Sequence, residues 1–229
     1  MGLASRTQAA AWIRDGRVSV GGQIVLDPEF PVRQGRDVIA VNGKVAADAE
    51  RLVLMLNKPR GLVTTTSDER GRDTVYRCFA DAALPWLAPV GRLDKASEGL
   101  LLFCNDPVWA ARITDPHSGP HKTYDVQVDC VPDAALVARI AAGATVDGEH
   151  LGVRAVRILR AGQRHGWLQI ELDEGRNRHL RRLLGTFEVG VLRLIRVAIG
   201  DLRLGTLAKG AWRALDAREI RALAGAAPP

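Results

Sequence analysis

Asp94 is the residue whose type and setting most favour chemistry. It lies in a short stretch bounded by Gly91 and Gly99, between two basic side chains, and an apolar run follows over residues 100–104. Glycine lets a backbone turn sharply or lets a ligand approach closely. A lone Arg-x-Asp is most often structural, with the acid paired to its basic neighbour. Here the glycines and the apolar run favour an ionised carboxylate at the mouth of a buried strand, aimed at a ligand.

Tyr124 is a second candidate, because it lies in a stretch with strand periodicity. Polar and apolar side chains alternate over Lys122–Val128, which predicts a half-buried strand. Tyr124 falls on the apolar face, so core packing and a stacking surface for a nucleobase are both open. Stacking a base on an aromatic ring contributes about 1–3 kcal/mol.

Four arginines within seven residues form a third candidate group, at the start of a helix predicted over residues 176–187. They are Arg176, Arg178, Arg181 and Arg182. A solvated basic face is the plain alternative. If Arg181 points inward it needs an anion, and a carboxylate beside an arginine stays ionised, with its pKa typically lowered by about 1–3 units. The other arginines suit phosphate contacts, which position a nucleic acid without reading its sequence.

The composition narrows the class of protein. The chain has 229 residues and a formal net charge of +6, which favours a polyanionic partner. It contains no long uncharged apolar run and no secretory signal pattern, so neither a membrane span nor export is predicted. The cysteines at 78, 104 and 130 form no close pair and indicate a reduced, cytosolic protein. No Cys/His cluster has metal-ligand spacing, and the histidines of the turn over residues 117–121 favour no metal site.

The elements that must position these residues fall into two units. Residues 1–46 carry a helix that begins after Ser5, a hairpin around Gly21-Gly22 and a further strand over residues 37–41. Residues 47–51 are predicted to be a linker. In residues 52–229, buried strands are predicted at 52–56 and 100–104, alternating strands at 122–128, 153–159, 167–172 and 191–199, and helices at 107–114, 133–142 and 176–187, with Asp216 capping a last helix. Strands mixed with helices in irregular order favour an α+β fold.

Several blocks together resemble a family of pseudouridine synthases, the ribosomal small-subunit type (RsuA/RluB/RluE/RluF). In order, over about residues 50–215, the blocks are Asn57-Lys58-Pro59-x-Gly61, Gly91-Arg92-Leu93-Asp94-x-x-Ser97-x-Gly99-Leu100-Leu101, Lys122-Thr123-Tyr124, Glu174-Gly175-Arg176-Asn177-Arg178 and Val191-Leu192-Arg193-Leu194-Ile195-Arg196. No single block is specific, but the ordered set is. The resemblance implies a central mixed, mainly antiparallel sheet flanked by helices.

The first 46 residues resemble the small RNA-binding domain of the ribosomal-protein S-four type. The matching pieces are Ala4-Ser5-Arg6, Asp15-Gly16-Arg17-Val18-x-Val20 and Val41-Asn42-Gly43-Lys44. Because the family's opening segment is missing before Ala4, the module is expected to be incomplete at its N-terminus. A late start codon, trimming or degradation of the module would each give this pattern. RNA contacts are expected from Arg6 and Arg17.

The resemblance implies a reaction on ribosomal RNA. A uridine is flipped out of its stack, its glycosidic bond is broken, and the base is rejoined through carbon 5. Asp94 would be the essential carboxylate, either as a nucleophile at the sugar or as the base that starts glycal formation. Tyr124 would stack on the uracil, and Arg181, or Arg178 if the register slips, would pair with Asp94.

The remaining expectations concern RNA contacts and partners. Arg92 would contact RNA beside the vacated position in the stack. Lys58 is expected to shape the site within its motif and is placed with Arg176, Arg178 and Arg182 among the RNA-binding residues, while a solvated lysine at a strand end is its plain alternative. Gly91 and Gly99 would let the Asp94 loop approach the flipped nucleotide.

An isomerisation is redox-neutral, so neither a metal nor an organic cofactor is expected. The protein is expected to be a cytoplasmic monomer, because no large unexplained apolar stripe remains. The alternatives are a non-catalytic RNA-binding or ribosome-assembly factor and, more weakly, a hydrolase that releases uracil from a nucleoside.

Overall fold

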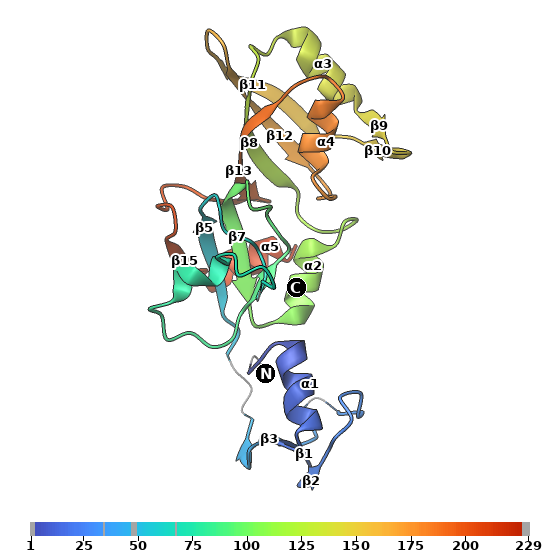
Figure 1. Ribbon diagram of the computed structural model, residues 1–229, viewed down its shortest axis with the longest axis vertical. Helices are drawn as coiled ribbons and strands as arrows, with labels where there is room; N and C mark the ends of the chain where they lie inside the picture. The colour runs from blue at the N-terminus through green and yellow to red at the C-terminus, as the bar shows by residue number, and fades with distance from the viewer. Residues whose placement is uncertain (1–2, 34, 47–49, 67, 226–229) are drawn as a thin grey trace.

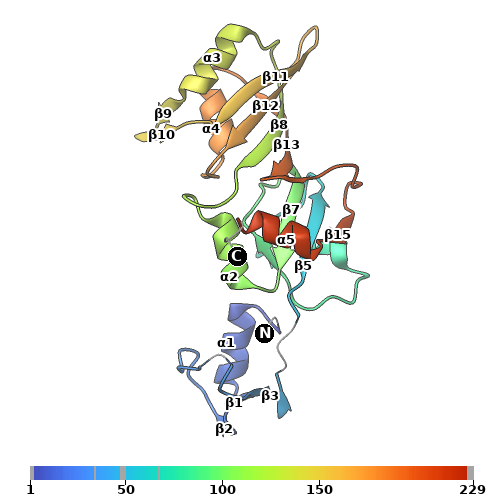
Figure 2. The same cartoon turned by 180° about the vertical axis from the view of Figure 1, so that it is seen from behind.

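The computed structural model describes residues 3–33, 35–46, 50–66 and 68–225. Figure 1 shows an elongated chain with a small N-terminal unit at one end and the larger sheet with its helices filling the rest. The reverse view in Figure 2 shows the same separation. A linker is predicted over residues 47–51, and residues 47–49 of it lie outside the described part of the chain, so its bounds stay a prediction.

The N-terminal unit contains one helix and four short strands. Helix α1 (Arg6–Arg14) begins after Ser5, whose side chain accepts a hydrogen bond from the backbone of Gln8 in a capping box, as the sequence predicts. The strands β1 (Val18–Val20), β2 (Gln23–Ile24), β3 (Ile39–Val41) and β4 (Lys44–Val45) pair antiparallel in the order β2-β1-β3-β4. The predicted hairpin turn lies at Gly21 and Gly22, both with positive φ.

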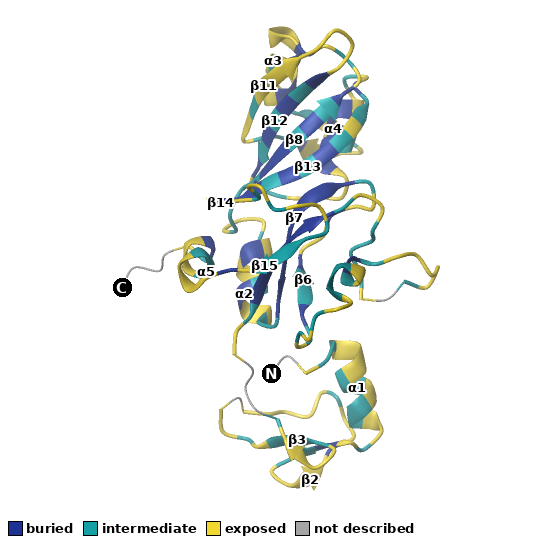
Figure 3. Cartoon of the chain, turned by 90° about the vertical axis from the view of Figure 1, so that its left-hand side faces the viewer, coloured by how far each residue is buried: buried dark blue, intermediate teal, exposed yellow. Residues whose placement is uncertain are grey.

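This unit buries few of its apolar side chains. Val18 and Val25 are its buried hydrophobic residues in the described ranges, and α1 has none. Ile24, Leu26 and Val45 are each more than 60% exposed. Figure 3 shows the contrast with the buried strands of the larger unit. These exposed side chains are single residues on short strands and loops, and the expected monomeric state stays a prediction.

The larger unit is built on a nine-stranded sheet. Its main path is β11-β12-β8-β13-β7-β5-β15, with β14 on β13 and β6 on β7. The strands are β5 (Val53–Lys58), β6 (Ala88–Val90), β7 (Glu98–Cys104), β8 (Lys122–Val128), β11 (Ala155–Ala161), β12 (Gly166–Leu172), β13 (Val191–Ile199), β14 (Leu202–Arg203) and β15 (Trp212–Ala214). All pairs are antiparallel except β13 with β7. The expected mixed, mainly antiparallel sheet in an α+β fold is confirmed.

The neighbouring strands β5 and β7 are covered on both faces. Leu54 and Leu101 point into one apolar core, while Met55 and Leu102 point into another. The second core is closed by α2 (Pro107–Thr114) and α5 (Ala217–Leu223), and the first extends beneath α3 (Ala134–Ala142) and α4 (His179–Gly185). Burial on both faces explains why the chain runs continuously apolar here instead of alternating.

Helix ends in the larger unit follow their capping residues. Asp106, Asp133 and Asp216 accept hydrogen bonds from the first turns of α2, α3 and α5. Helix α4 begins at His179 instead of residue 176, because Arg178 adopts a left-handed conformation with φ of 49°. That turn separates a loop over residues 173–178 from the helix. The 3-10 helix η1 (Val75–Phe79) and the hairpin of β9 (Ala144–Val146) and β10 (Glu149–Leu151) complete the fold. No helix in the described ranges is long and apolar enough to span a membrane.

Candidate active site

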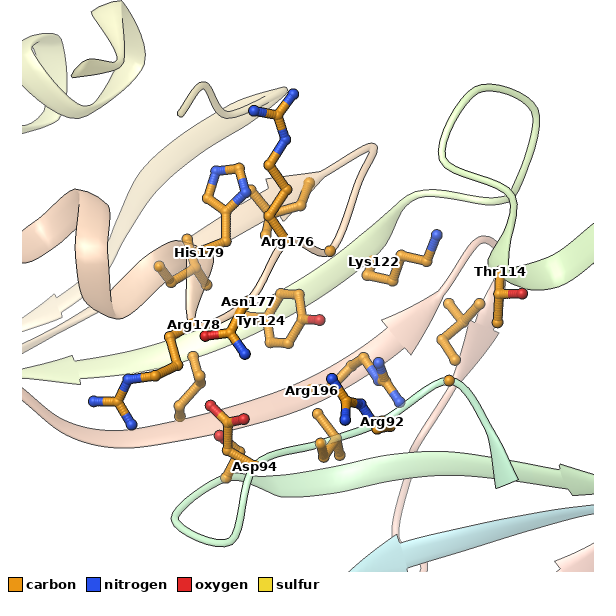
Figure 4. Close-up of a pocket in the computed structure, with 18 of the residues that line it drawn as sticks. Arg92, Asp94, Thr114, Lys122, Tyr124, Arg176, Asn177, Arg178, His179 and Arg196 are labelled. Carbon is orange, nitrogen blue, oxygen red and sulfur yellow. The ribbon is translucent and has the colours of Figure 1, made fainter. Parts of the chain in front are cut away.

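A cavity of about 300 Å³ opens between the Asp94 loop, strands β8 and β13, and the loop that leads into α4. Figure 4 shows Asp94 and Tyr124 on opposite walls of this cavity, with Arg178 and Asn177 near the Asp94 end. A second hollow of about 400 Å³ shares Arg92, Asp94 and Asn177 with the first. The structure thus brings Asp94, Tyr124 and the arginine-rich segment, which lie up to 87 residues apart in the chain (94 to 181), to one place.

The backbone of the Asp94 loop is held from below by a buried lysine. Lys58 is 0% exposed, and its ammonium donates hydrogen bonds to the carbonyl oxygens of Pro59 (3.1 Å), Asp94 (3.2 Å) and Ser97 (2.8 Å). Burial lowers the pKa of Lys58 from 10.5 to about 8, against the opposing effect of the nearby Asp94 charge. A side chain so placed cannot reach RNA. The expectation that Lys58 binds RNA, like the alternative of a solvated lysine, is therefore wrong, whereas its expected part in shaping the site agrees with these contacts.

Further hydrogen bonds fix the same loop from its flanks. The Thr64 hydroxyl donates to the carbonyl oxygen of Leu93 (2.7 Å) and accepts from the Leu93 amide (3.3 Å). The amide of Gly61 donates to the carbonyl oxygen of Lys95 (2.7 Å). With its backbone fixed on both sides, the loop leaves the Asp94 side chain exposed at the cavity. Such preorganisation is what a reacting carboxylate requires.

A buried ion cluster anchors the strand that follows the loop. Glu98 is 2% exposed and accepts hydrogen bonds from Arg193 (3.0 and 3.1 Å) and from Lys209. Burial alone would raise the pKa of Glu98, but these two cations hold it below its ordinary value. The cluster fastens the start of β7 to β13 and to the loop before β15.

Gly99 allows β7 to pack closely against β13 and does not line the cavity. A Cβ at this position would lie 2.3 Å from the carbonyl oxygen of Arg196 on β13, and the residue has φ of +100°. The expectation that Gly99 gives a nucleotide access is therefore wrong, because the close neighbour is a strand. Gly91, with φ of +74°, does line the cavity.

Tyr124 forms the wall opposite Asp94. It is 8% exposed, so most of its ring packs in the core while its remaining surface meets the cavity. Tyr124 is thus both a core residue and a cavity residue, and its stacking on a base stays a prediction. Its cross-strand partner in the register is Arg196.

Arg181 enters the cavity wall from α4. Its Nη1 donates to the carbonyl oxygen of Val191 (3.1 Å), while Nε and Nη2 are buried without a hydrogen-bond partner among the described residues. Burial lowers the pKa of Arg181, the Arg178 charge lowers it further, and the Asp94 charge opposes this. Asp94 is thus close enough to act on Arg181, but no ion pair joins them in the described structure. Their pairing stays a prediction.

The other predicted arginines divide into three groups. Arg176 and Arg182 both bind Glu149 (2.8 and 2.7 Å), which ties the β9–β10 hairpin to α4. Arg176 also pairs with Glu174, and Arg182 with Asp147. Arg92 and Arg178 are exposed and line the cavity. Arg6 and Arg17 lie exposed on the N-terminal unit, where Arg17 binds Asn42 (3.0 Å) and stacks over Trp12.

Sequence reasoning missed residues that complete the cavity, namely Lys122, Asn177, His179 and Arg196. The signal for Arg196 was present, because an arginine at an inward position of an alternating strand needs a partner. His179 binds the Gly152 carbonyl oxygen through Nε2 (2.9 Å), and burial lowers its pKa.

The cavity lining contains buried hydrogen-bond donors without acceptors in the described part of the chain, and more positive than negative charge. Among the described residues, the buried side-chain nitrogens without a partner are His179 Nδ1, Arg181 Nε and Nη2, and Arg196 Nη2, and all three residues line this cavity. Buried polar groups are normally paired, so this cluster leaves donors that a ligand or water can satisfy. Six basic side chains line the cavity against one carboxylate, Asp94. No group of three His, Cys, Asp or Glu side chains in the described ranges could hold a metal ion.

Comparisons with known proteins agree with this geometry. A family model described as RNA pseudouridylate synthase matches residues 52–185, and an S4 domain model matches residues 1–38. An uncharacterized RNA pseudouridine synthase of Aquifex aeolicus is 34% identical over 97% of this chain and 89% of its own length. The ribosomal large subunit pseudouridine synthase B of Bacillus subtilis is 31% identical over 97% of this chain and 91% of its own length.

Solved structures show the same relation. A crystal structure of a pseudouridylate synthase superposes with a TM-score of 0.68 and 29% identity, and covers 96% of this chain and 94% of that chain. The archaeal box H/ACA sRNP Nop10-Cbf5 complex contains a chain with a TM-score of 0.52 and 17% identity, covering 69% of this chain and 51% of that chain, which shows a shared fold alone.

Proposed function

Since the chain belongs to the RNA pseudouridylate synthase family, and is thus an isomerase that converts uridine in RNA to pseudouridine, we propose that its substrate is a uridine in ribosomal RNA and that Asp94 is the catalytic carboxylate. The relative from Bacillus subtilis, whose name specifies the large ribosomal subunit, supports ribosomal RNA as the substrate. The observation that carries the assignment of Asp94 is its place as the one carboxylate on a cavity lined by basic side chains.

The chemistry requires a base out of its stack and a fixed carboxylate. The bond between C1′ and N1 breaks, a bond between C1′ and C5 forms, and the hydrogen on C5 is replaced while N1 gains one, so that substrate and product are isomers. Flipping costs a few kcal/mol, which stacking on Tyr124 and contacts to the flanking backbone can offset. Asp94 then acts as a nucleophile at the sugar or as the base that starts glycal formation.

The basic residues take separate roles in this proposal. Arg181, with two unpaired guanidinium nitrogens beside the cavity, keeps Asp94 ionised once substrate excludes water. Arg92 and Arg178, exposed at the rim, contact the RNA chain. Lys58 acts on the Asp94 backbone and not on RNA. The N-terminal unit, through Arg6 and Arg17, adds affinity away from the cavity. We place the protein in the cytoplasm and expect that one copy carries the complete site.

The test is pseudouridine formation by the purified full chain on ribosomal RNA that lacks the modification. Asp94→Asn should abolish product while RNA binding stays close to that of the wild type. Asp81→Asn is the matched control, because Asp81 is exposed and lies outside the cavity. Full activity of Asp94→Asn would overturn the assignment. Release of free uracil by the wild type, detected by chromatography, would indicate hydrolysis instead.

A further inference from the structure

The lining of the cavity contains a buried arginine, Arg196, with a donor that no described residue uses. Arg196 on β13 is 5% exposed. Its Nε donates to the carbonyl oxygen of Leu100 on β7 (2.7 Å), which fixes the guanidinium in place. Its Nη2 is buried and has no hydrogen-bond partner among the described residues. A cation fixed in the lining of a cavity, with a donor that no described residue uses, is a preformed half of a binding site.

A second cation stands beside it. Lys122 begins β8 two residues before Tyr124, and the register pairs Arg196 with Tyr124 and Ile199 with Lys122. The side chains of Lys122, Tyr124 and Arg196 therefore lie on one face of the sheet and line the cavity, as Figure 4 shows. The ammonium of Lys122 makes one long hydrogen bond, 3.4 Å to the carbonyl oxygen of Asp173. Burial, and next the Arg196 charge, lower the pKa of Lys122.

The charges of Asp173 and Asp115 partly offset that of Lys122, but neither residue is part of the cavity lining. Asp94 is the one acidic residue in the lining among those that the structure describes, and Figure 4 shows it at the opposite end from Lys122 and Thr114. Two neighbouring cations in a partly dehydrated cavity repel each other, and an anion between them removes that cost. A uracil carbonyl could accept a hydrogen bond but would leave the charge unbalanced, whereas a phosphate supplies both acceptors and charge.

From this arrangement we propose that Arg196 and Lys122 form a subsite for a phosphodiester of the substrate RNA, next to the flipped uridine. The inference rests on the proposed function, because it assigns the part of the nucleotide that lies beyond Tyr124 when the sugar is at Asp94. The phosphate pins one end of the nucleotide, Tyr124 meets the base, and Asp94 meets the sugar. The subsite favours a uridine within a chain over a free nucleoside.

The test is the salt dependence of RNA affinity, measured by filter binding of the full chain to unmodified ribosomal RNA over a series of KCl concentrations. Each phosphate contact contributes about 0.7–1 to the slope of log affinity against log salt. Lys122→Gln and Arg196→Gln should each weaken binding several-fold at low salt and reduce the slope by about that amount. Arg196→Lys, which keeps the charge, should recover part of the slope. Arg218→Gln is the matched control, because Arg218 is exposed on α5 outside the cavity.

The outcomes separate the subsite from the function. Thermal unfolding first establishes that each variant is folded, and if Arg196→Gln is not, Lys122→Gln carries the test, since it removes one long hydrogen bond. A folded Lys122→Gln with the wild-type slope and affinity overturns the subsite. Pseudouridine formation by the wild type on the same RNA tests the function separately, so activity with unchanged slopes contradicts this inference alone.

Discussion

The two units of this chain differ in how firmly each is packed internally. In the larger unit, all residues of β5 and β7 are buried, and the loop that carries Asp94 is fixed by hydrogen bonds from Lys58, Thr64 and Gly61. In the N-terminal unit, the strands are two or three residues long and the helix buries no residue. Chemistry needs a carboxylate held in place, whereas phosphate contacts tolerate a looser surface. The structure concentrates its rigidity where the proposed reaction needs it.

The largest expected effect is on stability and separates the units directly. Leu101→Ala should lower the free energy of unfolding by about 2–5 kcal/mol, because Leu101 is 0% exposed in the first core. The matched change Ile24→Ala, at 68% exposure in the N-terminal unit, should stay within about 0.5 kcal/mol. Urea unfolding of both variants measures the difference. Equal losses would mean that the N-terminal unit is packed as firmly as the sheet.

Arg181 offers the next largest effect, on rate. Arg181→Met should reduce kcat by about 10²-fold, because it removes a preorganised cation beside Asp94. Arg178→Met should affect mainly KM, since Arg178 is exposed at the rim. Single-turnover pseudouridine formation distinguishes the two. If the larger loss of kcat falls on Arg178→Met, the roles of the two arginines are reversed.

The lowered pKa of Lys58 predicts that activity falls and stability rises as the pH increases above about 8. Above a pH of about 8, the native ammonium of Lys58 loses a proton and with it one of its three donors. Because Lys58 then fixes the Asp94 loop less firmly, kcat should fall by about tenfold. Because the unfolded chain keeps that proton up to its ordinary pKa of 10.5, the contribution of Lys58 to the free energy of unfolding rises between about pH 8 and 10.5.

The control for this pH dependence is Lys58→Met. It should be slow at every pH and lack the alkaline fall in kcat. A wild-type rate that stays level to pH 10 would contradict the proposed hold of Lys58 on the loop.

The smallest expected effect lies in the N-terminal unit. Arg17→Ala removes a hydrogen bond to Asn42 and the stacking over Trp12, which together contribute about 1–2 kcal/mol locally. RNA affinity should fall a few-fold with kcat unchanged. Binding and single-turnover rates measured on the same RNA check this. A fall in kcat would show that the N-terminal unit takes part in the catalytic step.

Much of the fold could be predicted from local patterns. Alternation identified β8 (Lys122–Val128) and β13 (Val191–Ile199) with their observed bounds, and α2 (Pro107–Thr114) coincides with its prediction. Helix α4 was predicted too long because periodicity does not reveal a left-handed residue such as Arg178. The short strands β6, β9, β10, β14 and β15 carry too few residues for a period to be read.

Site residues could be predicted where they belong to sequence motifs, but not where their role depends on contacts with residues far along the chain. Asp94, Tyr124 and Arg181 do line one cavity, as the ordered blocks suggested. Lys58 was misplaced among the RNA contacts, because its burial depends on three carbonyl groups, two of them more than 30 residues away. The ion pair of Glu98 was not predicted either, because its partner Lys209 is 111 positions away in the chain. Long-range contacts of this kind leave no periodic trace in a sequence.

We propose that Asp94, held by the rigid unit, isomerises a uridine in ribosomal RNA. The most direct test maps pseudouridine across the ribosomal RNA of a strain that lacks this gene, complemented with the wild type or with Asp94→Asn at equal protein levels. We expect the wild type to restore pseudouridine at a defined uridine and Asp94→Asn to restore none. Pseudouridine restored by Asp94→Asn, or a map unchanged by loss of the gene, would contradict this proposal.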